Sequence, residues 1–304
     1  RLTHADFDDR QLWVSLGGFG EAFALAAAQA GRGATFEAVD GAGFAGDRPA
    51  LALRLKLGDK AASASELGRW LTRRHSNKRT YETRAIASTT LAKIEKAVAP
   101  GGPISLAMVL DAGKRKTLAT LCKQAMATEV ESRARNTELS RWFRFSDELA
   151  KKRDGFGLPQ SGVTGFSRWF AETFVIDHES ICDPKSSFAK KGVEMAAEQA
   201  GSASAFVLIL SKGNGRKEQL EAGRAFLRLQ LAAEAEGIRS HPMSQALGGY
   251  PEQEPHLAAL HKALAVPSST HVQMLVRLGF AEPTEHAPRR PLSALWLEGS
   301  QSKA

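Results

Sequence analysis

The chain has 304 residues, of which 43% are hydrophobic and 24% charged, and its 41 Lys and Arg against 33 Asp and Glu give a net charge of +8. These values are ordinary for a globular protein of one large domain or two modest ones. No apolar run approaches the ~18 residues that a transmembrane helix needs, so we expect no membrane partner. The positive charge favours an anionic partner, and phosphate groups are the simplest candidate.

Nucleic acid is the competing anionic partner, but the basic residues are scattered along the chain. They include the short clusters Arg73-Arg74, Lys151-Lys152-Arg153 and Arg289-Arg290. No zinc-finger, RNA-recognition or basic-region pattern accompanies them, and we therefore expect no nucleic-acid partner.

The two cysteines, Cys122 and Cys182, form neither a CxxC pair nor a metal-ligand spacing. They predict two buried thiols in a reducing compartment, for which we expect the cytoplasm. His256 and His261 are five residues apart, which fits the usual helical metal pairs poorly, so we expect no metal site.

In chain order, the first predicted helix is the Ala-rich run Gly17–Gly31. A glycine-rich linker at Asp40–Asp47 separates it from the run Leu51–Gly58. This run alternates apolar and charged residues at period two, which predicts a half-buried strand.

Three elements are predicted after the basic stretch that begins at Thr72. They are an amphipathic helix over Ser88–Val98, a buried strand over Ile104–Leu110 and one long helix over Lys114–Glu138.

Residues 142–190 differ in character, because eight aromatic residues fall between Trp142 and Phe174, among glycines and a proline. Two interpretations stay open. The segment is either a lid with short helices or an ordinary satellite core under a long loop.

The last third of the chain contains the most strongly helical stretch, Ala222–Gly237 within Glu221–Leu247. Apolar residues recur there at spacings of three and four, which predicts a central helix that Gly237 terminates. A strand is predicted before this helix, over Ala203–Leu210, and a second, half-buried strand after it, over Val272–Gly279.

The two Ala-rich helices resemble each other. Gly17–Gly31 aligns with Gly223–Gly237 without a gap, and each copy is followed by a strand-like run that ends in Leu-Gly. Similar composition alone could produce two such helices, but a repeat of helix plus strand indicates two related halves in one chain.

The motif Arg74-x-Ser76-x-Lys78 places two cations and a hydroxyl on alternate residues. Alternate side chains of an extended segment share one face, which would present hydrogen-bond donors to an anion. Arg289-Arg290, between prolines, is a second basic pair, for which a solvated surface pair is the alternative.

With these residues the sequence resembles the FMN-dependent nitroreductase family, in particular its tandem branch of Acg-type proteins, in which one chain contains two nitroreductase-like halves. Arg74-His75-Ser76-Asn77-Lys78 matches the Arg-x-Ser-x-Arg/Lys flavin motif of that family. Gly223–Gly237 is similar to its long central dimer helix. Pro242-Met243-Ser244-Gln245 lies where the family places a loop against flavin N5 and O4, and Arg289-Arg290 matches the C-terminal pair that holds the phosphate.

The sequence also departs from the family pattern. Gly101–Ser105 stands where the family has Asn-x-Gln-Pro-Trp, and Ser244-Gln245 replaces the common Glu-Gly. Both differences affect flavin-edge contacts, so they bear on nitroreduction more than on flavin binding. The first half has no Arg-x-Ser-x-Lys, and we therefore expect one FMN per chain.

The resemblance implies an α+β, nitroreductase-like fold with an antiparallel-rich sheet wrapped by helices. The two repeat helices are expected to pack together, as a tandem pseudo-dimer within one chain that is a monomer or a weak dimer. Residues 1–68 would form a degenerate first half. Residues 69–304 would form the second half, with the FMN motif and the aromatic-rich, lid-like insertion 142–190.

The implied activity is that of an FMN-dependent NAD(P)H oxidoreductase. NADH or NADPH would be the electron donor, and a nitroaromatic, quinone or similar electrophilic small molecule the acceptor, with no protein acid or base required. Lys78 would lie near N1 and O2 of the flavin and stabilise the reduced form. The alternative is a non-catalytic FMN-binding or storage protein of the same fold. The residues expected to bind the cofactor are Arg74, His75, Ser76, Lys78, Pro242, Met243, Ser244, Gln245, Arg289 and Arg290.

Overall fold

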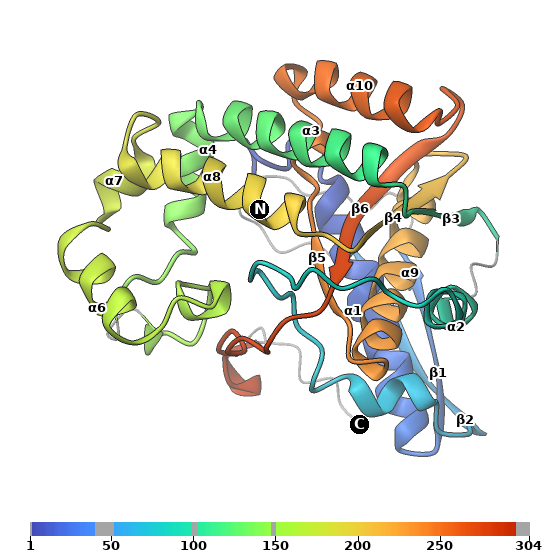
Figure 1. Cartoon of the computed structure of the whole chain (residues 1–304). Coiled ribbons are helices and arrows are strands. Elements are labelled where there is room, and N and C mark those ends of the chain that lie inside the picture. Colours follow the sequence, from blue (N-terminus) through green and yellow to red (C-terminus); the bar gives the residue numbers. More distant parts are fainter. Residues whose placement is uncertain (1, 40–51, 99–101, 147–149, 296–304) are drawn as a thin grey trace.

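The structure is a computed structural model that describes residues 2–39, 52–98, 102–146 and 150–295 (Figure 1). Its centre is a four-stranded antiparallel sheet with the strand order β3-β4-β6-β5. The strands are β3 (Ile104–Val109), β4 (Ala205–Ser211), β5 (Arg239–Pro242) and β6 (His271–Gly279). The linker predicted at Asp40–Asp47 lies outside the described residues.

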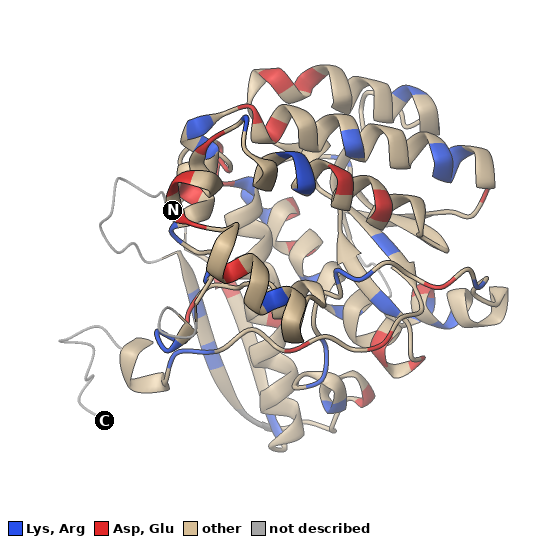
Figure 2. Cartoon of the chain, turned by 60° about the vertical axis from the view of Figure 1, so that its left-hand side comes forward, with Lys and Arg blue, Asp and Glu red and all other residues tan. Residues whose placement is uncertain are grey.

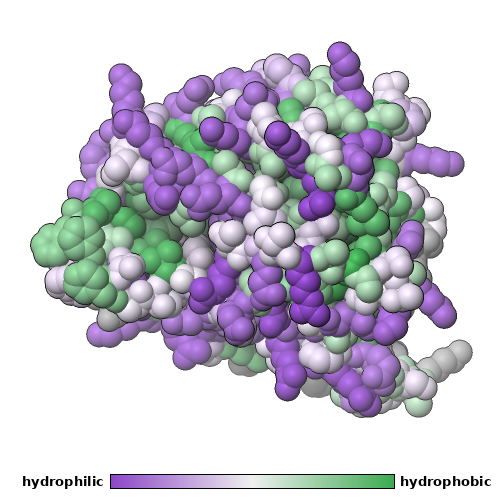
Figure 3. Space-filling view, viewed as in Figure 1, coloured by the Kyte–Doolittle hydropathy of each residue, from purple (hydrophilic) through white to green (hydrophobic). Residues whose placement is uncertain are grey.

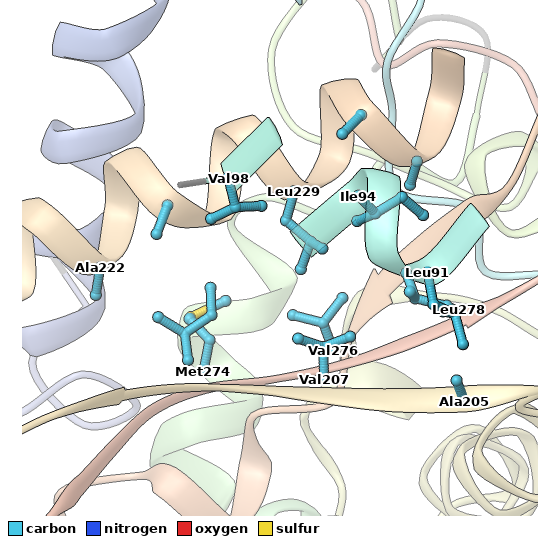
Figure 4. Packing of buried hydrophobic residues seen from close by; sticks show 14 of the residues in the cluster. Leu91, Ile94, Val98, Ala205, Val207, Ala222, Leu229, Met274, Val276 and Leu278 are labelled. Atoms are coloured by element: carbon cyan, nitrogen blue, oxygen red, sulfur yellow. The ribbon is translucent and has the colours of Figure 1, made fainter. Parts of the chain in front are cut away.

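Helices cover both faces of this sheet, which confirms the α+β, antiparallel-rich architecture. On one face lie α2 (Ser88–Val98) and α9 (Arg216–Ala235), and Figure 4 shows Ile94 and Leu229 directed toward Val207 and Val276. This core is built from alternate residues of β4 and β6.

On the opposite face lie α3 (Ala112–Val130), α8 (Ser187–Gly201) and α10 (Glu254–Leu264). They bury the other alternate residues, among them Phe206 and Leu275. The Val272–Gly279 strand was predicted to be half-buried, and that prediction was wrong. In β6 every residue after His271 is buried, because the two helical layers exclude water from both faces.

The long helix predicted over Lys114–Glu138 is divided in two. The helix α3 ends at Val130, and α4 (Arg133–Ser140) begins after Ser132, whose side chain accepts a hydrogen bond from the N–H of Arg135. Serine is a favoured N-cap residue because its hydroxyl satisfies an otherwise unpaired N–H, so it can start a new helix here.

The described part of the segment from 142 to 190 contains the short helices α6 (Gly165–Phe174) and α7 (His178–Cys182) and the start of α8. Phe143, Ile181 and Phe156 form a small core there, which corresponds to the satellite-core interpretation. Phe166 and Phe174 of α6 are exposed, and Figure 3 shows hydrophobic side chains gathered over this helix at the left edge. The described residues also form the 3-10 turns Glu66–Trp70, Pro159–Ser161, Gln245–Leu247, Pro251–Gln253 and Leu292–Leu295.

The N-terminal part adds α1 (Arg10–Gln29) and the two-stranded sheet of β1 (Arg32–Ala38) and β2 (Leu53–Ala61), which is antiparallel. The helix α1 lies along α9 (Figure 1). Buried Glu21 on α1 joins the two helices, since its carboxylate accepts hydrogen bonds from Arg224 at 3.0 Å and from Arg228 at 2.6 Å.

Two glycines allow the backbones of α1 and α9 to approach closely. A Cβ on Gly17 would collide with the carbonyl of Leu220, and a Cβ on Gly223 would collide with the carbonyl of Val14. The alignment that pairs Gly17 with Gly223 also pairs Val14 with Leu220, so each glycine contacts the equivalent residue of the other helix. Two related elements that meet around a two-fold axis are expected to make such contacts. The tandem pseudo-dimer itself stays a prediction.

None of the helices in the described ranges is long and apolar enough to cross a membrane. In Figure 2 the Lys and Arg residues are distributed over helices, strands and loops, together with acidic residues.

We expect Gly223→Ala to lower the free energy of unfolding by about 1–3 kcal/mol, because the added methyl group must push α1 away from α9. Urea denaturation would measure the loss. Gly201→Ala in α8 is the matched control, since its Cβ would meet no atom within 4 Å. Equal stabilities of the two variants would contradict the close helix contact.

Candidate functional site

The segment that contains Arg74, Ser76 and Lys78 is held in an extended form against β5. Ser76 pairs with Ser240 in a parallel β-bridge, and the N–H of Asn77 donates to the carbonyl of Ser240 at 3.0 Å. Asn77 is fully buried, and its side-chain amide donates to the carbonyl of Glu282 at 2.8 Å. Asn77 therefore points into the protein, and residues 74, 76 and 78 point the other way.

Arg277 on β6 holds the segment around Asn77 through hydrogen bonds to its backbone carbonyls. Its guanidinium is fully buried and lies 3.8 Å from the centre of the Tyr81 ring. Burial lowers its pKa to about 10. The guanidinium donates to the carbonyls of Arg79 at 2.8 Å, Asn77 at 3.2 Å and Gln199 at 2.8 Å, and to Nδ1 of His241 at 3.1 Å.

A cavity of about 1300 Å³ opens beside this segment. Arg74, Ser76 and Lys78 form one part of its wall, and the loop after β5 forms another. The small residues Gly18 and Ala22 of α1 also line it. Aromatic and other apolar contributions come from Phe19, Trp142, Phe156, Phe226, Tyr250 and Met274.

Lys78 brings an unpaired cation to this cavity. Among the described residues its ammonium has no hydrogen-bond acceptor, and it lies 4.5 Å from the centre of the Phe156 ring. Burial lowers the pKa of Lys78, while the carboxylate of Glu129 opposes this effect. A desolvated cation without an acceptor is poised to donate to a ligand.

Arg74 is a second cation on the same wall. Its guanidinium donates to Oε1 of Gln230 at 2.9 Å. Burial and the nearby charge of Arg289 both lower the pKa of Arg74, so the local potential is positive. The Nε2 of Gln230 and the Oε1 of Gln245 are buried and have no partner in the described part of the chain. Buried polar atoms normally have one, so these atoms point to a ligand or water.

Glu129, near the end of α3, also lines the cavity. Burial raises the pKa of its carboxyl to about 7, although Arg135 and Lys78 act in the opposite direction. His241 is a further titratable group of the cavity wall, and burial, Arg277 and Lys78 lower its pKa well below the ordinary value. The imidazole is therefore neutral at pH 7.

The structure brings six of the ten predicted site residues to one cavity and leaves four outside its wall. Those that line it are Arg74, Ser76, Lys78, Pro242, Ser244 and Gln245. His75 faces away, because adjacent residues of an extended segment alternate, and its ring lies 4.6 Å from that of His286. Met243 is buried in the core beneath the loop. Arg289 and Arg290 are exposed, although Arg289 lies near enough to affect Arg74.

Sequence reasoning missed Glu129, Gln230 and Arg277. Gln230 and Arg277 each have apolar residues on both sides in the sequence, and this was the available signal for both. Nothing in the local sequence distinguishes Glu129 from the solvated acidic residues of a helix.

No family model and no curated protein sequence matches the chain. It is similar to several solved structures. A nitroreductase with bound FMN from Bacteroides fragilis has 16% identity and a TM-score of 0.44, and the match covers 79% of this chain and 100% of that one. An FMN-dependent nitroreductase from Clostridium difficile has 15% identity and a TM-score of 0.42, over 77% and 96%. An iodotyrosine deiodinase bound to FMN and 3-iodo-L-tyrosine has 16% identity and a TM-score of 0.41, over 74% and 94%. Likenesses this distant carry no argument for the function of this chain, which is drawn below from its own residues.

We expect Arg277→Lys to destabilise the protein by at least about 1–3 kcal/mol, since one ammonium cannot serve all the acceptors of the guanidinium and leaves buried groups unpaired. Denaturation in urea measures the change. Arg69→Lys, at an exposed ion pair, is the control and should leave stability unchanged. A neutral Arg277→Lys would mean that the guanidinium does not hold the 74–81 segment.

Glu129 should make stability depend on pH. The pKa of Glu129 is about 7 in the folded protein and 4.5 ordinarily, so the folded state binds the proton more tightly than the unfolded state. Protonation of Glu129 therefore stabilises the folded protein. This stabilisation is complete below pH 4.5 and is lost as the pH rises through 7. Glu129→Gln is expected to be more stable than the parent at pH 8, by on the order of 2–3 kcal/mol, with the difference shrinking toward pH 4.5. Thermal denaturation at several pH values tests this. Glu131→Gln, at an exposed position nearby, should show no such trend.

Proposed function

We propose that the cavity binds FMN and that the chain is a flavin-dependent oxidoreductase. The single observation that carries the proposal is the convergence of Arg74, Ser76 and the unpaired Lys78 on one cavity wall. When bound, FMN would supply the hydride and electron chemistry of the reaction, which no side chain provides.

The charges of the cavity wall fit a flavin phosphate. Arg74 offers a guanidinium and Ser76 a hydroxyl, and the charge of Arg289 adds to the positive potential. Guanidinium groups bind phosphate with charge-assisted hydrogen bonds. Arg74 would thus anchor the anionic end of the cofactor.

Lys78 fits the other requirement of the cofactor, a positive charge near the ring. Its ammonium is desolvated and has no acceptor in the described protein, so it would stabilise negative charge on the reduced ring without reorganisation. The apolar side chains of Phe19, Phe226 and Met274 on the cavity wall fit the faces of a planar aromatic ligand.

The size of the cavity is also suitable. Its volume of about 1300 Å³ exceeds the roughly 300–1000 Å³ of typical small-molecule pockets. FMN would therefore leave room for a second, small ligand.

We propose NADH or NADPH as the electron donor, and a nitroaromatic, quinone or similar electrophilic molecule as the acceptor. The walls come from α1 as well as from residues 74–78, in keeping with the proposed tandem arrangement of two halves.

FMN titration of the purified protein tests the cofactor. The parent protein should quench flavin fluorescence at saturation. Arg74→Ala should weaken binding by roughly tenfold to a hundredfold, since a charge-assisted hydrogen bond contributes about 1.5–3 kcal/mol. Arg73→Ala is the matched control, because Arg73 is the adjacent cation, is exposed and does not line the cavity. Equal loss in both variants would contradict a specific phosphate contact.

Steady oxidation of NADH or NADPH with a quinone or nitroarene tests the enzyme. Flavin-loaded protein with no turnover would instead support a binding or storage role.

Lys78→Ala should lower the reduction potential of the bound flavin, because it removes the positive charge that stabilises the reduced form.

A further inference from the structure

Glu129 is the one acidic group of the cavity wall whose role the fold does not explain. In the described structure its carboxylate forms no hydrogen bond and no direct ion pair, although it lines the cavity. Glu138, by contrast, accepts hydrogen bonds from the N–H groups of Thr3, His4 and Ala5. The carboxylate of Asp6 likewise accepts from the N–H groups of the first turn of α1.

Arg135, whose charge acts on Glu129 more strongly than that of Lys78, has its guanidinium engaged elsewhere. Arg135 donates to the carbonyls of Thr128 and Glu129 and lies 4.0 Å from the centre of the Tyr250 ring. Its remaining nitrogen pairs with Glu252 at 3.7 Å. Arg135 is therefore a structural residue that joins α3 to α4, and it leaves the carboxylate of Glu129 free to face the cavity.

Lys78 is the group that complements Glu129. The two side chains line the same cavity, and each is near enough to shift the ionisation of the other. Neither has a hydrogen-bond partner in the described protein. At a pH above its pKa of about 7, Glu129 is a carboxylate that can only accept hydrogen bonds, whereas the ammonium of Lys78 can only donate them. Together they offer an acceptor and a donor to the same cavity, which are the two groups that a ligand edge with an N–H next to a carbonyl requires.

We propose that Glu129 accepts a hydrogen bond from the imide N–H of a planar ring, while Lys78 donates to the adjacent ring carbonyl. The inference rests on the proposed function, because FMN contains such an edge in the N3–H of its pyrimidine ring. Glu129 is thus a specificity-determining residue that selects ligands with an unsubstituted ring N–H. Ionisation of Glu129 in the folded protein costs stability as the pH rises through 7, and a ligand N–H that donates to the carboxylate would offset part of this cost.

The test compares FMN with FMN methylated at N3, which lacks the N–H. Dissociation constants from fluorescence quenching would be measured for the parent, Glu129→Gln and Glu129→Leu. The parent should bind N3-methyl-FMN at least tenfold more weakly than FMN. Glu129→Gln should keep most of that preference, since its amide oxygen still accepts, and Glu129→Leu should lose it.

The ratio of the two affinities is the informative quantity. Removal of the negative charge of Glu129 changes the attraction of the cavity for any anionic flavin, but it acts equally on both ligands and cancels in the ratio. Glu131→Leu, an exposed change close by, is expected to keep the parental ratio.

Two results overturn the inference, and they differ from each other. If Glu129→Leu retains the parental preference, the N–H is recognised elsewhere or Glu129 faces the acceptor, while the proposed function stands. If the parent binds no FMN, the proposed function fails and this inference fails with it.

Discussion

The candidate site depends on one buried cation, Arg277. A guanidinium in a central strand is costly to desolvate, and here its hydrogens are directed at carbonyl groups of two separate segments and at His241. These bonds force the backbone around Asn77 to lie flat against the sheet edge. The alternation of side chains along that backbone then places the two cations and the hydroxyl in the cavity. Arg74, Ser76 and Lys78 are thus positioned by a group that does not line the cavity itself.

The second requirement is the close contact of α1 with α9. Gly17 and Gly223 remove the side chains that would separate the helices, and Glu21 neutralises two arginines across the contact. Arg10 adds two further bonds, to the carbonyls of Gln273 and Leu247, and so fixes the start of α1 to β6 and the turn after β5. The N-terminal part of the chain thereby becomes a wall of the cavity formed by the C-terminal part.

The architecture was largely predictable from the sequence, because helix and strand periodicities are local. The helices and strands follow from spacing, and so does the shared face of residues 74, 76 and 78, whereas the antiparallel arrangement of the sheet was implied only by the family resemblance. Burial is not local, and this accounts for the errors. In Val272–Gly279 a charged residue among apolar ones suggested a solvent face, whereas Arg277 is fully enclosed. A helix break at Ser132 required a capping contact that periodicity does not record. Glu129 could not be found at all, since its character comes from Lys78 and from burial, and these exist only in the folded chain.

The arrangement of α1 also has a kinetic consequence. Val14 and Gly223, which meet in the helix contact, are separated by most of the chain, so this contact closes a very long loop. Such non-local contacts form slowly, because the entropy of closing the loop is lost before the contact compensates for it. A folding intermediate with the central sheet complete but α1 undocked would lack one wall of the cavity. A ligand that contacts both α1 and the rest of the cavity wall would bind the assembled chain more tightly and shift the population toward it by mass action, so ligand binding would stabilise the docked position of α1.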